Sequence, residues 1–245
     1  MCACVAVAFG LVAQEKKGFV LDKSAVAEYQ ARVLKRTGGN VTKPWKGFVA
    51  IVNQQRRIPA EDIRGAAGYL SSKGKIDVKV VSADSEATGA TMVIHVVDTK
   101  GKSAMTAMPY SWAAVVNVDA LAEGLRSEKA VAKFLPTRTR KEILRAFAYA
   151  AGAGGSSFPG NILDVVEIKE LDLHEAFLPE DAFDSALEHL KRHGIVPSEI
   201  MTYREACQEG WAPAPTNDVQ KKVWDEIHAL PAKPIKIKYD PKRDK

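Results

Sequence analysis

One apolar run organises the first half of the chain: Gly47-Phe48-Val49-Ala50-Ile51-Val52-Asn53. It is rich in β-branched residues and shows no polar alternation, which is typical of a strand buried on both faces. Pro59 and the two acidic residues that follow it predict a helix start, because proline fits the first turn and carboxylates favour the positive end of the helix dipole. We therefore expect a central strand followed by a helix that ends near Gly74.

More strands are expected on either side of this unit. Apolar β-rich segments at 76–81, 91–97 and 112–118 predict three of them. A strand, a helix and a strand with a short return imply parallel pairing through a right-handed crossover. Segment 103–110 contains Pro109, which suits an edge strand better than a central one. A helix is expected from about Thr139 to Ala151. This order of strands and helices along the chain predicts an α/β fold with a mixed, mostly parallel sheet.

Both ends of the chain differ in composition from this middle part. Residues 1–14 are apolar, too short to span a bilayer, and match the core of an export signal, although no Lys or Arg precedes them. They predict a secreted or periplasmic protein; an N-terminal strand or helix is the alternative. Residues 15–44 are expected to form an N-terminal helix and a linker, and residues 45–200 the α/β domain. Residues 201–245 form a Trp/Pro-rich arm.

The arm is expected to pack on the domain, with Trp211 and Trp224 as anchors. A surface for a partner is the alternative, because aromatic residues dominate interface energetics. The overall charge of +5 is modest, and basic residues are interspersed with acidic ones. A nucleic-acid-binding protein commonly has a basic stripe with aromatic residues between the charges, and this sequence has none, so we expect no nucleic-acid partner. We expect an unknown protein or peptide partner, no membrane span and a monomer.

The expected second-half helix has the spacing of a zinc-peptidase motif without its ligands. It reads Lys141-Glu142-Ile143-Leu144-Arg145-Ala146-Phe147-Ala148-Tyr149-Ala150-Ala151-Gly152. In the pattern H-E-x-x-H-x-x-G-x-x-H the glycine stands seven residues after the first histidine. With Gly152 in that place, the three ligand positions hold Arg145, Tyr149 and Gly155, and the general-base position holds Ala146. Zinc catalysis needs imidazoles or thiolates and a carboxylate, which these residues do not supply.

The order of elements and the register of this helix resemble metzincin peptidases, and archaemetzincins most of all. Their site helix commonly reads K-E-x-x-H-E-x-G-H-x-x-G, and Lys141, Glu142 and Gly152 fall in register with it. The resemblance covers about residues 45–160. It implies an antiparallel edge strand that forms one wall of a cleft over the site helix. No functional residue carries over, because the histidines and the glutamate are replaced and no methionine stands near Asn161–Asp164.

Together with the apolar leader, this resemblance predicts an exported, catalytically inactive metzincin-like protein that acts as a binding or scaffold module without metal or cofactor. The alternative is an enzyme or anion-binding protein with a site rebuilt around Arg145 and Tyr149, which share one helical face. A guanidinium and a phenol on that face can both donate to an anion. A third interpretation is a plain α/β domain unrelated to peptidases, which the strand order tests.

Other reactive residues give weaker patterns. His189 and His193 are four residues apart on an expected helix and have the spacing of two metal ligands, but the sequence shows no third one. A structural role is therefore favoured for both. Cys207 is the one cysteine beyond the leader, and nothing next to it indicates an activated thiol.

Overall fold

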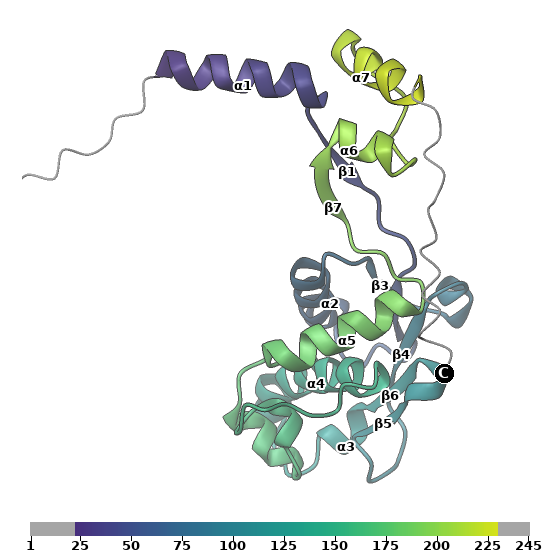
Figure 1. Ribbon diagram of the computed structural model, residues 1–245. Coiled ribbons are helices and arrows are strands. Elements are labelled where there is room, and N and C mark those ends of the chain that lie inside the picture. Colours follow the sequence, from purple (N-terminus) through teal and green to yellow (C-terminus); the bar gives the residue numbers. More distant parts are fainter. Residues whose placement is uncertain (1–22, 230–245) are drawn as a thin grey trace, which may run out of the picture. The chain divides into compact units, whose positions relative to one another are not determined.

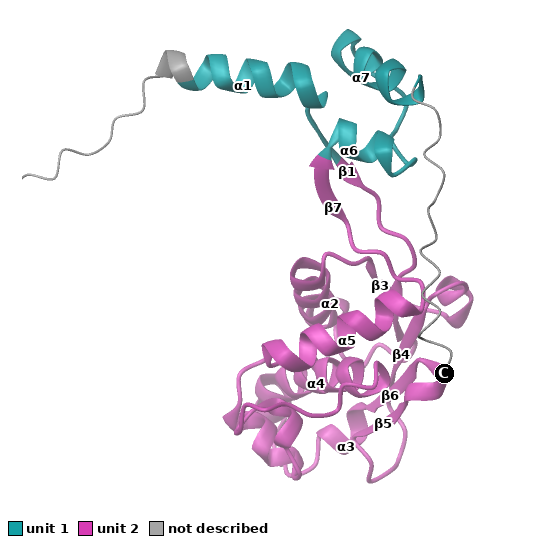
Figure 2. Ribbon diagram, viewed as in Figure 1, with its two compact units in different colours: residues 1–41, 202–245 teal, residues 42–201 magenta. Residues whose placement is uncertain are grey.

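The computed structural model describes residues 23–229, with side chains from Val26 onward. The export signal expected at residues 1–14 lies outside the described residues. Two compact units form: residues 42–201 are one, and residues 1–41 with 202–245 are the other (Figure 2). None of the described helices is long and apolar enough to cross a membrane.

The larger unit, called the α/β unit below, contains a five-stranded sheet in the order β3-β2-β4-β6-β5 (Figure 1). Its strands are β2 (Val49–Asn53), β3 (Val78–Val81), β4 (Met92–Val97), β5 (Met105–Met108) and β6 (Ala113–Asn117). Strand β2 pairs in parallel with β3 and β4, and β4 with β6. Strand β5 lies at the edge and runs antiparallel to β6. The predicted mixed, mostly parallel sheet with one antiparallel edge strand is confirmed. The strand order tests the alternative of a plain α/β domain unrelated to peptidases, and the edge position of β5 favours the metzincin-like order.

Helices and 3-10 turns fill the rest of this unit. The helices are α2 (Ala60–Gly74), α3 (Val118–Leu121), α4 (Glu128–Ala150) and α5 (Glu180–Arg192). The 3-10 turns are η1 (Asp84–Ala87), η2 (Pro109–Ser111), η3 (Ile162–Asp164) and η4 (Ile168–Leu173). Helices α2 and α4 pack against each other and against the sheet, and α5 packs on α4.

The main core lies between the sheet and these helices. Every residue of β2 is buried, as the uninterrupted apolar run predicts. Strand β4 instead alternates, with Met92, Ile94 and Val96 in the core. Phe147 of α4 and Phe183 of α5 stack with ring centroids 6.0 Å apart and are both buried. Helix α4 also contacts β4, β5 and β6, so it packs on the sheet where the resemblance places a site helix.

Helix α4 begins eleven residues before the predicted start at Thr139. Ser127 caps it by accepting a hydrogen bond from the Ala130 amide, and Pro136 lies inside the helix. Proline in a helix interior removes one backbone donor and normally ends a helix, so the sequence pattern concealed the first turns. The prediction was wrong here because packing outweighs the local preference. The helix end was correct: Gly152 follows it with φ 78°.

The smaller unit contains α1 (Lys23–Thr37), α6 (Tyr203–Gln208) and α7 (Asp218–His228). Tyr203, Cys207 and Val223 are buried together, and Trp224 packs against them. The Tyr203 hydroxyl donates to the Pro213 carbonyl at 2.9 Å. The arm therefore forms helices with a small core of their own. Its packing on the α/β domain stays a prediction, and its last residues, from 230, lie outside the described part.

Strands β1 (Asn40–Lys43) and β7 (Glu199–Thr202) pair as a separate two-stranded sheet where the chain passes between the units. Sequence reasoning missed both strands. They are short and largely exposed, so their pattern carries little hydrophobic signal.

Candidate functional site

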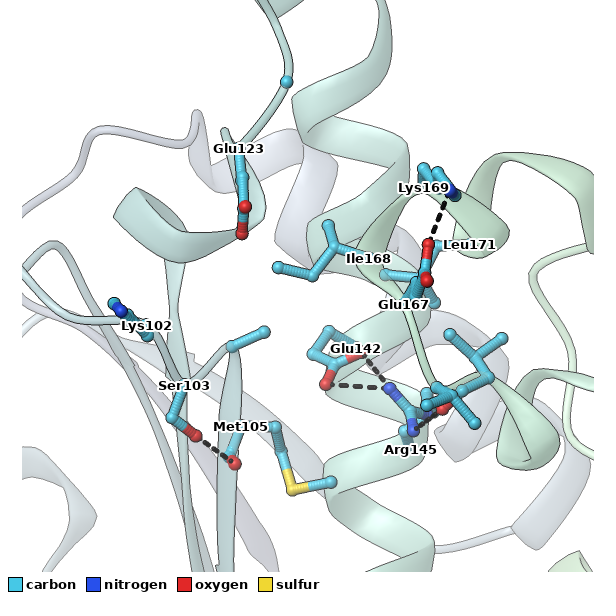
Figure 3. Close-up of a pocket in the computed structure, with 14 residues that line it drawn as sticks. Lys102, Ser103, Met105, Glu123, Glu142, Arg145, Glu167, Ile168, Lys169 and Leu171 are labelled. Atoms are coloured by element: carbon cyan, nitrogen blue, oxygen red, sulfur yellow. Dashed lines mark hydrogen bonds and ion pairs between the residues drawn. The ribbon is translucent and has the colours of Figure 1, made fainter.

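A cleft of about 640 Å³ lies between the edge strand β5 and helix α4. Its first wall is the segment that leads into β5, from Lys102 to Met105. Its floor is formed by Glu142 and Arg145 of α4, and its second wall by residues 165–169 with Leu171. Figure 3 shows Met105 on one side of the cavity, with the floor pair and Ile168 across from it. The cleft over the helix that the resemblance implies is thus present.

A buried ion pair forms the floor. Arg145 Nη1 donates to both carboxylate oxygens of Glu142, at 3.1 and 2.9 Å. Arg145 Nη2 donates to the Val165 carbonyl at 2.9 Å, and no described partner meets its buried Nε. The side chains of Glu142 and Arg145 are 1% and 13% exposed. The guanidinium therefore ties the helix to the second wall while its charge is balanced by Glu142.

Burial raises the pKa of Glu142, and the charge and hydrogen bonds of Arg145 offset part of this rise. The direction follows from the competition between two effects. Removing a carboxylate from water disfavours its charged form, whereas a neighbouring cation favours it. Burial is the larger effect here, and Arg145 keeps the pKa of Glu142 lower than burial alone would.

Two buried basic residues of α4, Arg138 and Lys141, bind the second wall of the cleft to this helix. Arg138 donates from Nε and Nη2 to the Asp172 carboxylate at 2.9 and 2.7 Å, and from Nη1 to the carbonyls of Leu121 and Glu123. Lys141 Nζ donates to the Leu171 carbonyl. Desolvation lowers the pKa of Lys141, with Asp172 acting in the opposite direction. These bonds fix η4 over α4 and so define the width of the cleft.

The two residues predicted for an anion site do not meet in the cleft. Arg145 lines it, but Tyr149 does not. The Tyr149 hydroxyl donates to the Leu163 carbonyl at 3.1 Å, and Arg145 Cζ lies 5.9 Å from the Tyr149 ring centroid. Anion binding by Arg145 and Tyr149 stays a prediction, and it requires Glu142 to release the guanidinium. Sequence reasoning missed Glu142 as the partner, although Glu142 and Arg145 have the i,i+3 spacing of a helical ion pair.

The donor set does not fit zinc. The positions that align with ligands and base hold a paired guanidinium, a phenol bonded to a carbonyl, a glycine and the buried Ala146. Within the described side chains, no group of three or more His, Cys, Asp or Glu residues is arranged to hold a metal ion. Zinc chemistry needs three protein ligands around an open position. No catalytic step through a metal is therefore derived for this cleft.

His189 of α5 and His193, which follows that helix, do not line this cleft. His189 Nδ1 is 2.6 Å from the Ala151 carbonyl, and the His193 ring lies against Trp112 with centroids 4.1 Å apart. Cys207 is buried in the smaller unit, and burial raises the pKa of its thiol. An inert thiol fits that position, because the thiolate is the reactive form.

No protein-family model matches this chain, and no curated protein matches it. Three solved structures are similar in part. An archaemetzincin from Methanopyrus kandleri is 15% identical with a TM-score of 0.45, covering 60% of this chain and 96% of its own. A zinc-dependent peptidase from Methanocorpusculum labreanum is 13% identical (TM-score 0.41; 57% and 100% covered). An archaemetzincin from Archaeoglobus fulgidus, solved with malonate, is 12% identical (TM-score 0.39; 56% and 99% covered). Two of the three carry the name of the family that the sequence resembles.

Proposed function

We propose that this protein is an exported, non-catalytic binding module whose cleft between β5 and α4 holds an extended peptide segment. The observation that carries the proposal is the floor of the cleft. A closed Glu142–Arg145 ion pair lies there, and the aligned positions offer neither metal ligands nor a base. The fold thus retains a peptidase-like groove while its chemistry favours holding a ligand over cleaving it.

The edge strand supplies the means of binding. In an antiparallel pair, alternate residues direct both backbone groups to the partner strand. The Asn117 amide donates to the Ala104 carbonyl, so Ala104 and Thr106 face β6, while Met105 and Ala107 present their backbone groups to the other side. Ser103 Oγ donates to the Met105 carbonyl. The Ala107 amide is therefore placed to pair with an added strand, the mode known as β-augmentation.

The walls of the cleft indicate the side chains that such a peptide carries. Met105 and Ile168 give an apolar centre. Lys102 and Glu123 lie at the margins, and the Lys169–Glu167 ion pair is exposed there. Exposed pairs contribute little to stability and separate readily, so they remain available to a ligand. A segment with alternating apolar and charged residues matches this lining.

The test is peptide selection against the full chain, followed by affinity measurement with two variants. A library of random octapeptides is expected to yield binders, whose affinity is then measured by fluorescence anisotropy. Ala107→Pro removes the outward amide and is tolerated at an edge strand, so it is expected to weaken binding about tenfold, the effect of one lost hydrogen bond. Ala107→Val has similar bulk and retains the amide, and its affinity is expected to stay within about twofold.

Two results would contradict the proposal. Equal affinities for the two variants would place the peptide away from β5. Stoichiometric zinc in the purified protein, together with chelator-sensitive cleavage of casein or a peptide library, would end the non-catalytic interpretation.

A further inference from the structure

A second cavity, of about 270 Å³, lies where η2 meets the ends of α4 and α5. It is separate from the β5–α4 cleft and shares no lining residue with it. Two aromatic side chains, Tyr110 and Trp112, line it together with the basic side chains His189, Arg192 and His193. None of the described residues that line it is acidic. We name this cavity the Trp112 pocket.

The backbone holds Trp112 in an unusual conformation beside this pocket. Its φ of 51° and ψ of 42° lie in the left-handed region, which bulky residues rarely adopt. The amide of Trp112 donates to the Pro109 carbonyl, which closes the η2 turn. The result is an indole ring lying against the His193 imidazole, with centroids 4.1 Å apart. Two flat rings thus form one side of the pocket, and the wholly exposed Tyr110 stands at its margin.

His189 is oriented by the end of α4. Its Nδ1 lies 2.6 Å from the Ala151 carbonyl, and since a carbonyl only accepts, Nδ1 carries the hydrogen. In that tautomer the other ring nitrogen, Nε2, carries no hydrogen and acts as an acceptor. Gly152 makes this approach feasible, because a Cβ there would come within 3.3 Å of His189 Nδ1.

Arg192 adds a cation whose charge acts on one described carboxylate, Glu188 four residues earlier, and that carboxylate is hydrogen-bonded to Lys191. Its side chain is exposed and forms no ion pair within the described part of the chain. The neighbouring Lys191, by contrast, is paired with Glu188 at 2.8 Å. A guanidinium is planar and permanently charged, and it binds carboxylate or phosphate through two parallel hydrogen bonds.

We propose that the Trp112 pocket binds a small aromatic anion, meaning a flat ring that carries a phosphate or carboxylate group. The ring stacks against Trp112 and His193, and the oxyanion is held by Arg192. Aromatic rings attract flat ligands through offset or edge contacts. The volume of the Trp112 pocket lies just below the usual range for ligand pockets, so the pocket fits only a small molecule. A metal fits less well, because the cationic guanidinium shares the cavity and no third ligand lines it.

The proposal is tested by isothermal titration of the full chain with four probes. 1-Naphthyl phosphate and 1-naphthoate combine ring and charge, whereas 1-naphthol and inorganic phosphate each carry one part. We expect at least one of the combined probes to bind at least tenfold more tightly than both single-feature probes. Whichever combined probe binds better identifies phosphate or carboxylate as the preferred anion. Equal binding of inorganic phosphate, or no binding by either combined probe, would overturn the proposal.

Three variants locate the site. Trp112→Gly removes the ring and suits the left-handed backbone, and Arg192→Gln removes the charge from an exposed position. Each is expected to weaken binding of the combined probe at least tenfold. Lys133→Gln makes the same change in net charge at an exposed position of α4 outside the pocket, and is expected to change the affinity less than twofold. Equal losses for Arg192→Gln and Lys133→Gln would show attraction to overall charge and would reject the site.

Discussion

Replacing Arg138 with leucine is expected to destabilise the α/β unit by about 3–5 kcal/mol, the cost of removing one partner from a buried ion pair. Arg138 is 3% exposed and donates four hydrogen bonds, two to Asp172 and two to backbone carbonyls. Leucine fills part of the volume but leaves all four acceptors without their donor. Unsatisfied buried acceptors cost free energy in addition to the lost bonds.

Urea unfolding of the full chain, followed by circular dichroism, measures this loss as a lower midpoint. Lys191→Gln is the control, because its ion pair with Glu188 is largely exposed and such pairs contribute little. Arg138→Lys is a second comparison: it keeps the charge but cannot reproduce the bidentate fork, so an intermediate loss is expected. A midpoint for Arg138→Leu equal to that of the control would show that Asp172 and the two carbonyls find other partners.

The same contacts explain why the cleft has a fixed wall. Segment 162–173 contains two 3-10 turns; it buries Ile162, Leu163, Val165 and Leu171 in the main core and exposes Val166. Arg138 and Lys141 bind it to α4, and Arg145 binds it once more through Val165. Three basic residues of one helix thus act together with the buried Val165 and Leu171 to position the second wall.

The sequence predicted the sheet well because its central strands are apolar. Residues 49–53 are all buried and alternate residues of 92–97 are buried, and burial of apolar surface is what the hydrophobic pattern records. Pro109 correctly placed β5 at the edge. The sequence failed for η4, whose position depends on a distant partner, Arg138 bound to Asp172. It failed for β1 and β7 because they are short and have no buried residue.

The candidate site was predicted only in part. Sequence reasoning identified Arg145 and its helix, and it expected the cleft over that helix. It did not identify Arg138 or Lys141, since basic residues on a helix are usually solvated. It also paired Arg145 with Tyr149 because they share a helical face, whereas the structure joins Arg145 to Glu142 one turn before it. Whether Arg145 binds Glu142 or Tyr149 depends on which of them is buried beside it, and a sequence pattern does not report the burial of polar groups.

Replacing Arg145 with methionine is expected to destabilise the α/β unit by about 3–5 kcal/mol at neutral pH, because it leaves Glu142 buried without a partner. Glu142 is 1% exposed, so water does not replace the guanidinium. Methionine has a similar length and retains the packing of the aliphatic stem. The loss therefore measures the uncompensated charge and the broken bonds to Glu142 and Val165.

The loss is expected to shrink as the pH falls, and the sign follows from the pKa of Glu142. Burial raises this pKa in the folded protein, and loss of Arg145 raises it further, because Arg145 offsets part of the rise. A carboxyl group with a raised folded-state pKa contributes stability below its unfolded value, about 4.3, and loses that contribution as the pH rises through the folded value. The variant should thus approach the parent near pH 4.5 and differ most at pH 7.5.

Urea unfolding of the parent and Arg145→Met at pH 4.5, 6.0 and 7.5 tests this dependence, since the difference between the two proteins cancels the titration of all other groups. The double variant Glu142→Gln/Arg145→Met is the matched control: with the buried charge removed, most of the stability lost at pH 7.5 should return and the extra pH dependence should vanish. A loss of equal size at all three pH values would mean that Arg145 acts through Val165 and packing alone. The floor of the cleft would then be held by the bond from α4 to the second wall, with Glu142 contributing nothing through its charge.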